Sequence, residues 1–228
     1  MTPGALRGWF ARLRAAAGTP ARRLGLNVVT VVKRRLLRPY AGRLLASPLT
    51  SGLRIRAATM RPKGVLEVLG RLDAVGVPTW LLGGWGVDAL VGHQTRRHAD
   101  LDLLLDCPDE RRAVAELAAL GYRRVTSEDV GAPLTPRRVA VYDALGRSVD
   151  LHPVDLRRWL ATVAAERLPG VDDPARAAFA DGHIGGRPVR CLSAALQVAA
   201  HDGYDPRDAD RQDLHRLQAL SCAPPAWP

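Results

Sequence analysis

The apolar residues of the chain change from one regular spacing to another along its length. A helix is predicted over residues 62–76, ended by Gly76, because apolar residues recur there at every third position. A short buried strand is predicted over residues 101–105, where Asp102 alone interrupts a run of leucines. The alternation of helical and strand-like segments indicates an α+β domain.

The remaining segments extend this pattern to the end of the chain. Further strands are predicted at residues 79–82, 122–126, 137–142 and 149–151, and a tight hairpin at residues 184–189. Further helices are predicted at residues 85–91, 109–120, 194–200 and 208–220. This order predicts a mixed sheet with helices on one face, followed by C-terminal helices.

Charge divides the chain into two unequal parts. Residues 1–59 contain twelve Lys or Arg and no Asp or Glu, whereas residues 60–228 contain 21 basic and 23 acidic residues. The net charge of +10 therefore belongs to the N-terminal part, and the rest is close to neutral. We predict a basic extension at residues 1–59 and one catalytic domain at residues 60–228.

The basic extension has several interpretations. It could form an amphipathic helix that binds nucleic acid or an anionic membrane surface, or it could be disordered, or it could precede a true start at Met60. No run approaches the length of a membrane span, and no secretory signal is evident. The three cysteines are widely spaced, which favours reduced thiols and a cytoplasmic location.

The candidate chemistry lies at a Gly-rich turn and at two carboxylates that follow it. Gly83 and Gly84 precede a predicted helix and can bring backbone N–H groups and a helix N-terminus to a phosphate. Asp100 and Asp102 project from the same face of one strand. Because adjacent carboxylates repel unless a cation lies between them, the pattern favours Mg²⁺ and a nucleoside triphosphate.

Three ordered segments carry a resemblance to a known family. They read GGWGVDALVGHQTRRHADLDL at residues 83–103, SVDLHPV at residues 148–154, and GRPVRCLS at residues 186–193, followed by HDGYD and DRQD. Together they resemble, from about residue 62 to about residue 220, the antibiotic nucleotidyltransferases. The lincosamide nucleotidyltransferases and the aminoglycoside adenylyltransferases are the branches concerned, both within the DNA polymerase β nucleotidyltransferase superfamily.

The resemblance implies a fold and a reaction. The fold would be a polymerase-β-like nucleotidyltransferase core, a mixed sheet with helices packed on it. The reaction would be Mg²⁺-dependent transfer of AMP from ATP to a hydroxyl of a lincosamide- or aminoglycoside-type antibiotic, with release of pyrophosphate. The chain would then be an antibiotic-resistance enzyme.

The resemblance also assigns roles to residues of this chain. Asp100 and Asp102 would bind the metal, and Asp150 would be the catalytic base or a ligand of a second metal. The nucleotide would be bound by Gly83, Gly84, Arg96 and His98. Arg96 would clamp the triphosphate, and His98 would either contact it or support the motif. The acceptor would contact His152 and Tyr204, although His152 could equally adjust the base or pack beside Pro153.

The acceptor is the least determined part of this prediction. A polycationic aminoglycoside needs an acidic pocket, for which Glu128-Asp129 and Asp172-Asp173 are candidates, whereas a lincosamide needs more apolar walls. The VDLHPV and HDGYD segments look more like the lincosamide branch, and a hydroxylated metabolite is also compatible.

Two other classes of protein remain open. One is a nucleotidyltransferase that acts on a macromolecule such as tRNA, with residues 1–59 as an RNA tether. The other is a non-catalytic nucleotide-binding protein, against which the retention of Asp100, Asp102 and Asp150 argues.

Overall fold

The computed structural model describes residues 59–129, 134–201 and 205–222. The chain divides into two units, residues 1–46 and 47–228, and every described residue belongs to the second. The predicted basic extension therefore lies outside the described residues, except for Thr59. Met60 belongs to the folded part, because it is fully buried and its N–H donates to the carbonyl of His98.

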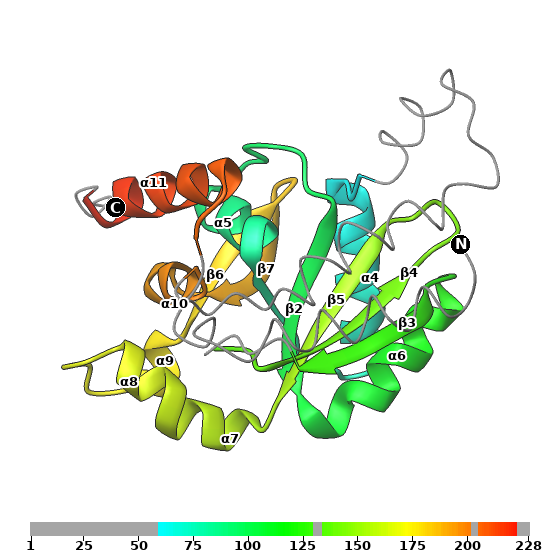
Figure 1. The fold of residues 1–228 in the computed structure, drawn as a ribbon, viewed down its shortest axis with the longest axis horizontal. Helices are drawn as coiled ribbons and strands as arrows, with labels where there is room; N and C mark the ends of the chain where they lie inside the picture. Colours follow the sequence, from blue (N-terminus) through cyan, green and yellow to red (C-terminus); the bar gives the residue numbers. More distant parts are fainter. Residues whose placement is uncertain (1–58, 130–133, 202–204, 223–228) are drawn as a thin grey trace, which may run out of the picture. The chain divides into compact units, whose positions relative to one another are not determined.

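A seven-stranded mixed sheet forms the centre of the described unit, in the order β3-β4-β5-β2-β1-β7-β6 (Figure 1). The strands are β1 (Trp80–Leu82), β2 (Asp100–Asp106), β3 (Arg123–Asp129), β4 (Arg137–Tyr142), β5 (Ser148–Val154), β6 (Phe179–Ile184) and β7 (Arg187–Leu192). β2 and β5 are parallel, as are β1 and β7, and the other neighbours are antiparallel.

Helices connect and cover these strands. They are α4 (Pro62–Ala74), α5 (Gly83–Val91), α6 (Glu110–Ala119), α7 (Leu156–Trp159), α8 (Ala165–Arg167), α9 (Pro174–Ala177), α10 (Ala194–Ala199) and α11 (Asp208–Cys222). A 3₁₀ turn, Cys107–Asp109, leads into α6, and a π-helical turn, Leu160–Ala164, joins α7 to α8. Among the described residues, no helix combines the length and the apolar character that a membrane span requires.

The predicted elements are confirmed in kind, and most differ by a few residues at their ends. α4 ends at Ala74 instead of residue 76, and α5 begins at Gly83 instead of residue 85. The strand at residues 137–142 agrees in full, whereas β5 is longer than predicted. The predicted hairpin is formed by β6 and β7 around Gly185 and Gly186, both with positive φ.

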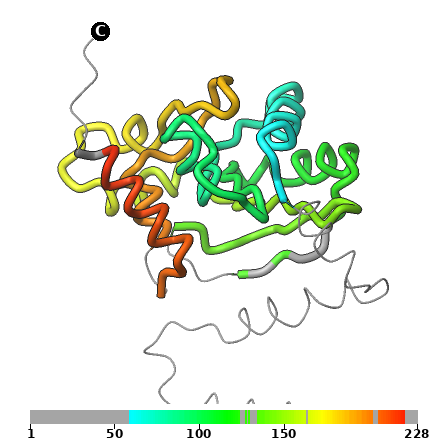
Figure 2. The backbone as a smooth tube through the Cα atoms, turned by 90° about the horizontal axis from the view of Figure 1, so that it is seen from above, coloured from blue at the N-terminus to red at the C-terminus, as the bar shows by residue number. Residues whose placement is uncertain are grey.

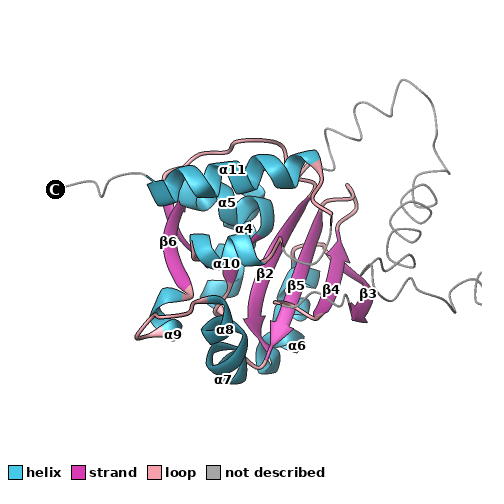
Figure 3. Ribbon diagram, turned by 60° about the vertical axis from the view of Figure 1, so that its left-hand side comes forward, coloured by secondary structure: helices cyan, strands magenta, loops and turns pink. Residues whose placement is uncertain are grey.

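The prediction that helices cover one face of the sheet is wrong. On β2, Leu101, Leu103 and Leu105 pack with α4 and α6, which lie side by side in Figure 2. Leu104 points the other way and belongs to a second apolar cluster with Trp159, with residues of α10 and with residues that flank α8. Figure 3 shows α10 and α11 together, and α11 also contacts α5. Helices therefore pack on both faces, because alternate strand residues are apolar on both sides.

Candidate active site

The predicted carboxylates come together on two neighbouring parallel strands. Asp102 of β2 lies directly opposite Asp150 of β5, and Asp100 lies opposite Ser148 at the start of both strands. Because directly opposite residues in a sheet point to the same face, the side chains of Asp102 and Asp150 emerge side by side. The register thus brings together two carboxylates that are far apart in the sequence, as the roles predicted for them require.

Asp150 is buried as a charged group beside a partner that the sequence analysis missed. The residue is 2 % exposed, and Oδ2 accepts a hydrogen bond of 2.8 Å from Nη1 of Arg138 on β4. Its other oxygen, Oδ1, is buried without a hydrogen-bond partner. Burial, followed by the negative charge of Asp102, raises the pKa of Asp150 from 3.8 to about 6, although Arg138 opposes the shift.

His152 lies on the same strand as Asp150 but contacts the other carboxylate. Its Nε2 is 3.1 Å from Oδ1 of Asp102, and the residue is 7 % exposed. The imidazole therefore holds Asp102 rather than Asp150, and its predicted contact with an acceptor stays a prediction. Tyr204, the other residue predicted to bind the acceptor, lies outside the described residues.

The carboxylate pair fits a hard divalent cation. Oδ1 of Asp150 is buried without a hydrogen-bond partner and could bind a cation. The pKa of this residue is raised by burial and by the charge of Asp102, and a cation would offset both effects. Mg²⁺ commonly binds one or two carboxylates together with substrate phosphates. As the side chains stand in the described parts of the chain, no three His, Cys, Asp or Glu residues converge on one point. Arg138 and His152 each take one oxygen of the pair.

The Gly-rich turn packs directly on one of these carboxylates, Asp102. Gly83 has φ +63°, and a Cβ atom there would lie 2.7 Å from Oδ2 of Asp102. A Cβ atom on Gly84 would lie 2.3 Å from Nδ1 of His98 and 2.7 Å from Nη2 of Arg96. The absence of side chains at both positions lets the start of α5, the carboxylate strand and the Arg96 guanidinium meet. This close approach is what a phosphate-binding turn requires.

A buried network holds the loop that carries Arg96 and His98. Asp88 of α5 accepts hydrogen bonds from the N–H of Thr95 at 3.0 Å and from its hydroxyl at 2.6 Å, and it also bonds Nε2 of His98. Burial raises the pKa of Asp88, but the hydrogen bonds from His98 and Thr95 outweigh it and leave the pKa below 3.8. His98 is 2 % exposed and packs on Trp85. It therefore supports the loop, and its contact with nucleotide stays a prediction.

Arg96 reaches the site from this loop and is paired with the C-terminal helix. Its Nη2 lies 2.5 Å from Oδ2 of Asp213 on α11, and the Arg96 side chain remains 25 % exposed. No periodicity in the sequence indicates this contact, because the two residues are 117 positions apart. Asp213 is one of the residues whose role the sequence analysis did not identify.

The candidate acidic residues for an aminoglycoside have local roles or lie at loop ends. Asp173 accepts a hydrogen bond from the N–H of Arg176 and thereby caps α9. Asp172 is exposed beside it, and Asp129 ends β3.

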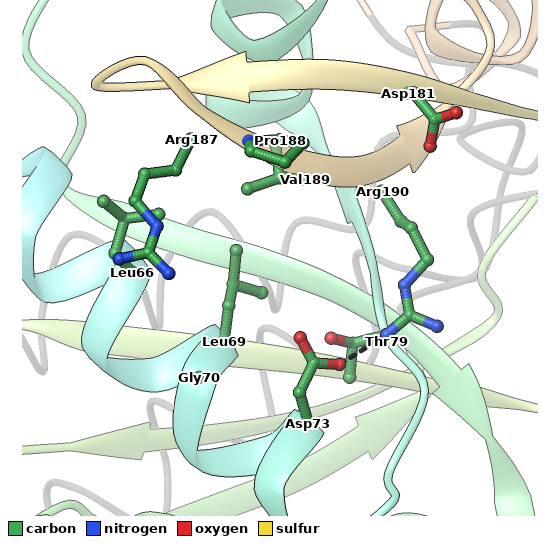
Figure 4. A pocket seen from close by; sticks show the side chains of 10 residues that line it. All are labelled: Leu66, Leu69, Gly70, Asp73, Thr79, Asp181, Arg187, Pro188, Val189 and Arg190. Carbon is green, nitrogen blue, oxygen red and sulfur yellow. Dashed lines mark hydrogen bonds and ion pairs between the residues drawn. The ribbon is translucent and has the colours of Figure 1, made fainter.

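A cavity of about 260 Å³ lies between α4 and the β6–β7 hairpin (Figure 4). An ion pair between Asp73 and Arg190 lies at its border. Leu69 and Val189, which line it, belong to the same apolar cluster as Leu101 and Leu103, whereas the carboxylates project from the other face of β2. None of the predicted site residues is among the ten that line this cavity.

Comparison with known proteins decides the family. Residues 64–217 match the sequence profile of the aminoglycoside-2''-adenylyltransferases. The chain belongs to the aminoglycoside-2''-adenylyltransferase family. This membership confirms the predicted resemblance to antibiotic nucleotidyltransferases, and it makes the chain a nucleotidyltransferase.

Members of both branches of the family are similar to this chain. A lincosamide resistance protein of Staphylococcus haemolyticus is 26 % identical over 159 residues, which are 70 % of this chain and 95 % of that protein. A 2''-aminoglycoside nucleotidyltransferase of Escherichia coli is 35 % identical over 129 residues, which are 56 % of this chain and 64 % of that protein. The second match thus covers just under two thirds of its relative.

Two solved structures share their fold with this chain. The lincosamide antibiotic adenylyltransferase LnuA with bound lincomycin superposes with a TM-score of 0.56 at 24 % identity, over 71 % of this chain and 99 % of that one. ANT(2'')-Ia in complex with adenylyl-2''-tobramycin gives a TM-score of 0.50 at 20 % identity, over 69 % and 87 %. The predicted α+β class is confirmed, and the polymerase-β-like assignment stays a prediction.

Proposed function

We propose that this chain transfers AMP from ATP, with Mg²⁺, to a hydroxyl group of a lincosamide- or aminoglycoside-type antibiotic and releases pyrophosphate. The observation that carries the proposal is the meeting of Asp102 and Asp150 on parallel strands, directly beside the Gly83-Gly84 turn. Carboxylates for a metal and backbone N–H groups for phosphates are the two requirements of nucleotidyl transfer. A cytoplasmic location, where ATP is available, is part of the proposal.

Each residue of the site has a stated role in this reaction. Asp100 and Asp102 would hold Mg²⁺, which when bound neutralises charge that develops on the phosphates. The Gly83-Gly84 turn and Arg96 would bind the triphosphate. His152 would hold Asp102 in its orientation through the bond to Oδ1.

Asp150 would accept the proton of the acceptor hydroxyl as that oxygen attacks the α-phosphorus. A pKa of about 6 suits a general base near neutral pH, because the carboxylate is ionised yet retains proton affinity. The hydrogen bond from Arg138 engages Oδ2 and leaves Oδ1 for the incoming proton or for the metal.

We favour a lincosamide as the acceptor. The lincosamide resistance protein aligns over 95 % of its length, whereas the aminoglycoside nucleotidyltransferase aligns over 64 %.

The test is transfer of label by the purified full chain. It would be incubated with Mg²⁺ and α-labelled ATP against lincosamides, aminoglycosides and bulk tRNA, with product mass as the readout. The proposal expects one nucleotide added to a single antibiotic class. Asp102→Asn should be inactive, and Asp181→Asn, an exposed carboxylate on β6, should be active. Label that enters only tRNA would replace the proposal with the macromolecular alternative.

A further inference from the structure

The C-terminal helix α11 reaches the candidate nucleotide site through one buried carboxylate. Asp213 is 1 % exposed, and its two oxygens face the Nε and Nη2 edge of Arg96 at 3.2 Å and 2.5 Å. Arg216, one turn further along the same helix, lies 3.4 Å from Oδ1 of Asp213. A bidentate ion pair of this kind fixes the plane of the guanidinium as well as its distance from the carboxylate.

Further interactions fix the guanidinium and the loop that carries it. Its Nη1 donates to the carbonyl of Arg97 at 3.3 Å, and its Nη2 is 2.7 Å from the position of a Cβ atom on Gly84. The residue before it, Thr95, is bound to Asp88 through both its N–H and its hydroxyl. The loop is therefore fixed from α5, and the end of the Arg96 side chain is fixed from α11.

The pair leaves part of Arg96 available to a ligand. A guanidinium carries more N–H donors than Asp213 and the carbonyl of Arg97 engage, and the Arg96 side chain is 25 % exposed whereas that of Asp213 is 1 % exposed. The pair is thus buried on the side of α11 and open on the other side. An ion pair that served only to attach α11 would not need its arginine to lie against the phosphate-binding turn.

We propose that Asp213 is a positioning residue of the nucleotide site, which holds Arg96 against Gly84 with its remaining donors directed to the triphosphate. The inference rests on the proposed function, and it makes α11 part of the nucleotide site rather than an appended helix. Asp213 touches no substrate itself and acts through Arg96. Loss of its negative charge would free the guanidinium to leave the turn.

The experiment compares nucleotide binding by full-length wild type, Asp213→Asn and Asp208→Asn. Asp208 is the matched control, because it pairs with Arg211 on the same helix but its side chain is 90 % exposed. The probe is Mg²⁺ with α,β-methylene ATP, which cannot donate AMP, and the readout is the Kd from calorimetry. We expect Asp213→Asn to weaken binding about tenfold, and Asp208→Asn to leave it unchanged.

Steady-state kinetics distinguish a role of Asp213 in positioning Arg96 from a role in attaching α11 to the rest of the fold. A positioning role raises KM for ATP and leaves KM for the acceptor unchanged. Wild-type nucleotide affinity in Asp213→Asn would overturn the proposal, as would an equal loss of affinity for nucleotide and acceptor. If Asp213→Asn does not fold, Asp213→Glu keeps the charge but moves the carboxylate, and the same comparison is made. Absence of nucleotide binding by the wild type would instead overturn the proposed function.

Discussion

Asp150→Asn is expected to stabilise the metal-free protein at neutral pH while it abolishes activity. Asp150 is 2 % exposed in the wild type, and its pKa rises from 3.8 to about 6 because burial and Asp102 disfavour its charge. A native pKa above the unfolded one means that the native state binds more protons between these two values. Stability therefore falls as pH rises through this window.

The size of the effect follows from the same shift. A change in pKa from 3.8 to about 6 corresponds to about 3 kcal/mol, since each tenfold change in proton affinity is worth about 1.4 kcal/mol. Asparagine does not ionise, yet its side-chain oxygen still accepts from Arg138. The advantage of Asp150→Asn over wild type should therefore grow by about 2 kcal/mol between about pH 4.5 and pH 7.5.

Urea unfolding in the presence of EDTA measures this advantage at both pH values. Asp210→Asn is the control, because Asp210 is also buried but its pKa is lowered by hydrogen bonds from Arg207, which outweigh burial. Its stabilising contribution is complete above its unfolded pKa of about 3.8 and is lost only as pH falls below that value, so the control difference should not grow over the range tested. The reasoning is refuted if the gap between wild type and Asp150→Asn stays constant with pH.

Four further changes test other parts of the site and fold. Asp102→Asn should reduce transfer below detection and weaken Mg²⁺-dependent nucleotide binding, with an unchanged circular dichroism spectrum; full activity would exclude β2 as the metal strand. Gly84→Ala should raise KM for ATP, because the new methyl would lie 2.3 Å from Nδ1 of His98, whereas Gly70→Ala on α4 meets nothing within 4 Å and should leave KM unchanged. Gly86→Ala should lower stability by about 1–3 kcal/mol in thermal unfolding, since its methyl would lie 1.9 Å from Nε2 of Gln197 and 3.0 Å from the Leu81 carbonyl. A chain that starts at Met60 should keep the kcat of the full chain, and a loss of more than tenfold would show that residues 1–59 contribute to catalysis.

Local patterns in the sequence predicted most of the fold. The strands and the longer helices were predicted because the apolar residues of each recur at the regular spacing of a strand or of a helix. For β4 the predicted range is correct. The short helices α7 and α9 and the turn-length α8 were missed, since four or fewer residues carry too little periodicity to be detected. Helices on both faces were missed because Leu104 alone marks the second apolar face of β2.

The candidate site was predicted only where its residues lie within motifs. The glycines and the three aspartates stand in recognisable segments, and the register of β2 with β5 brings Asp102 and Asp150 together as expected. Arg138 and Asp213 were missed, because their contacts depend on which strands are neighbours and on where α11 docks. Neither property is encoded in the spacing of nearby residues.

The order of the strands has a consequence for how the chain is made. β1 is an interior strand of the sheet, and on one side its neighbour is β7, which pairs with it through Leu81 and Cys191. That side of β1 has no partner until more than a hundred further residues have been synthesised. During translation the backbone N–H and C=O groups on that side of β1 therefore stay unpaired while the five strands that precede β6 have already been made. Premature termination before β7 would leave a fragment with all three predicted metal-site carboxylates but an open sheet edge, and this fragment should be prone to self-association.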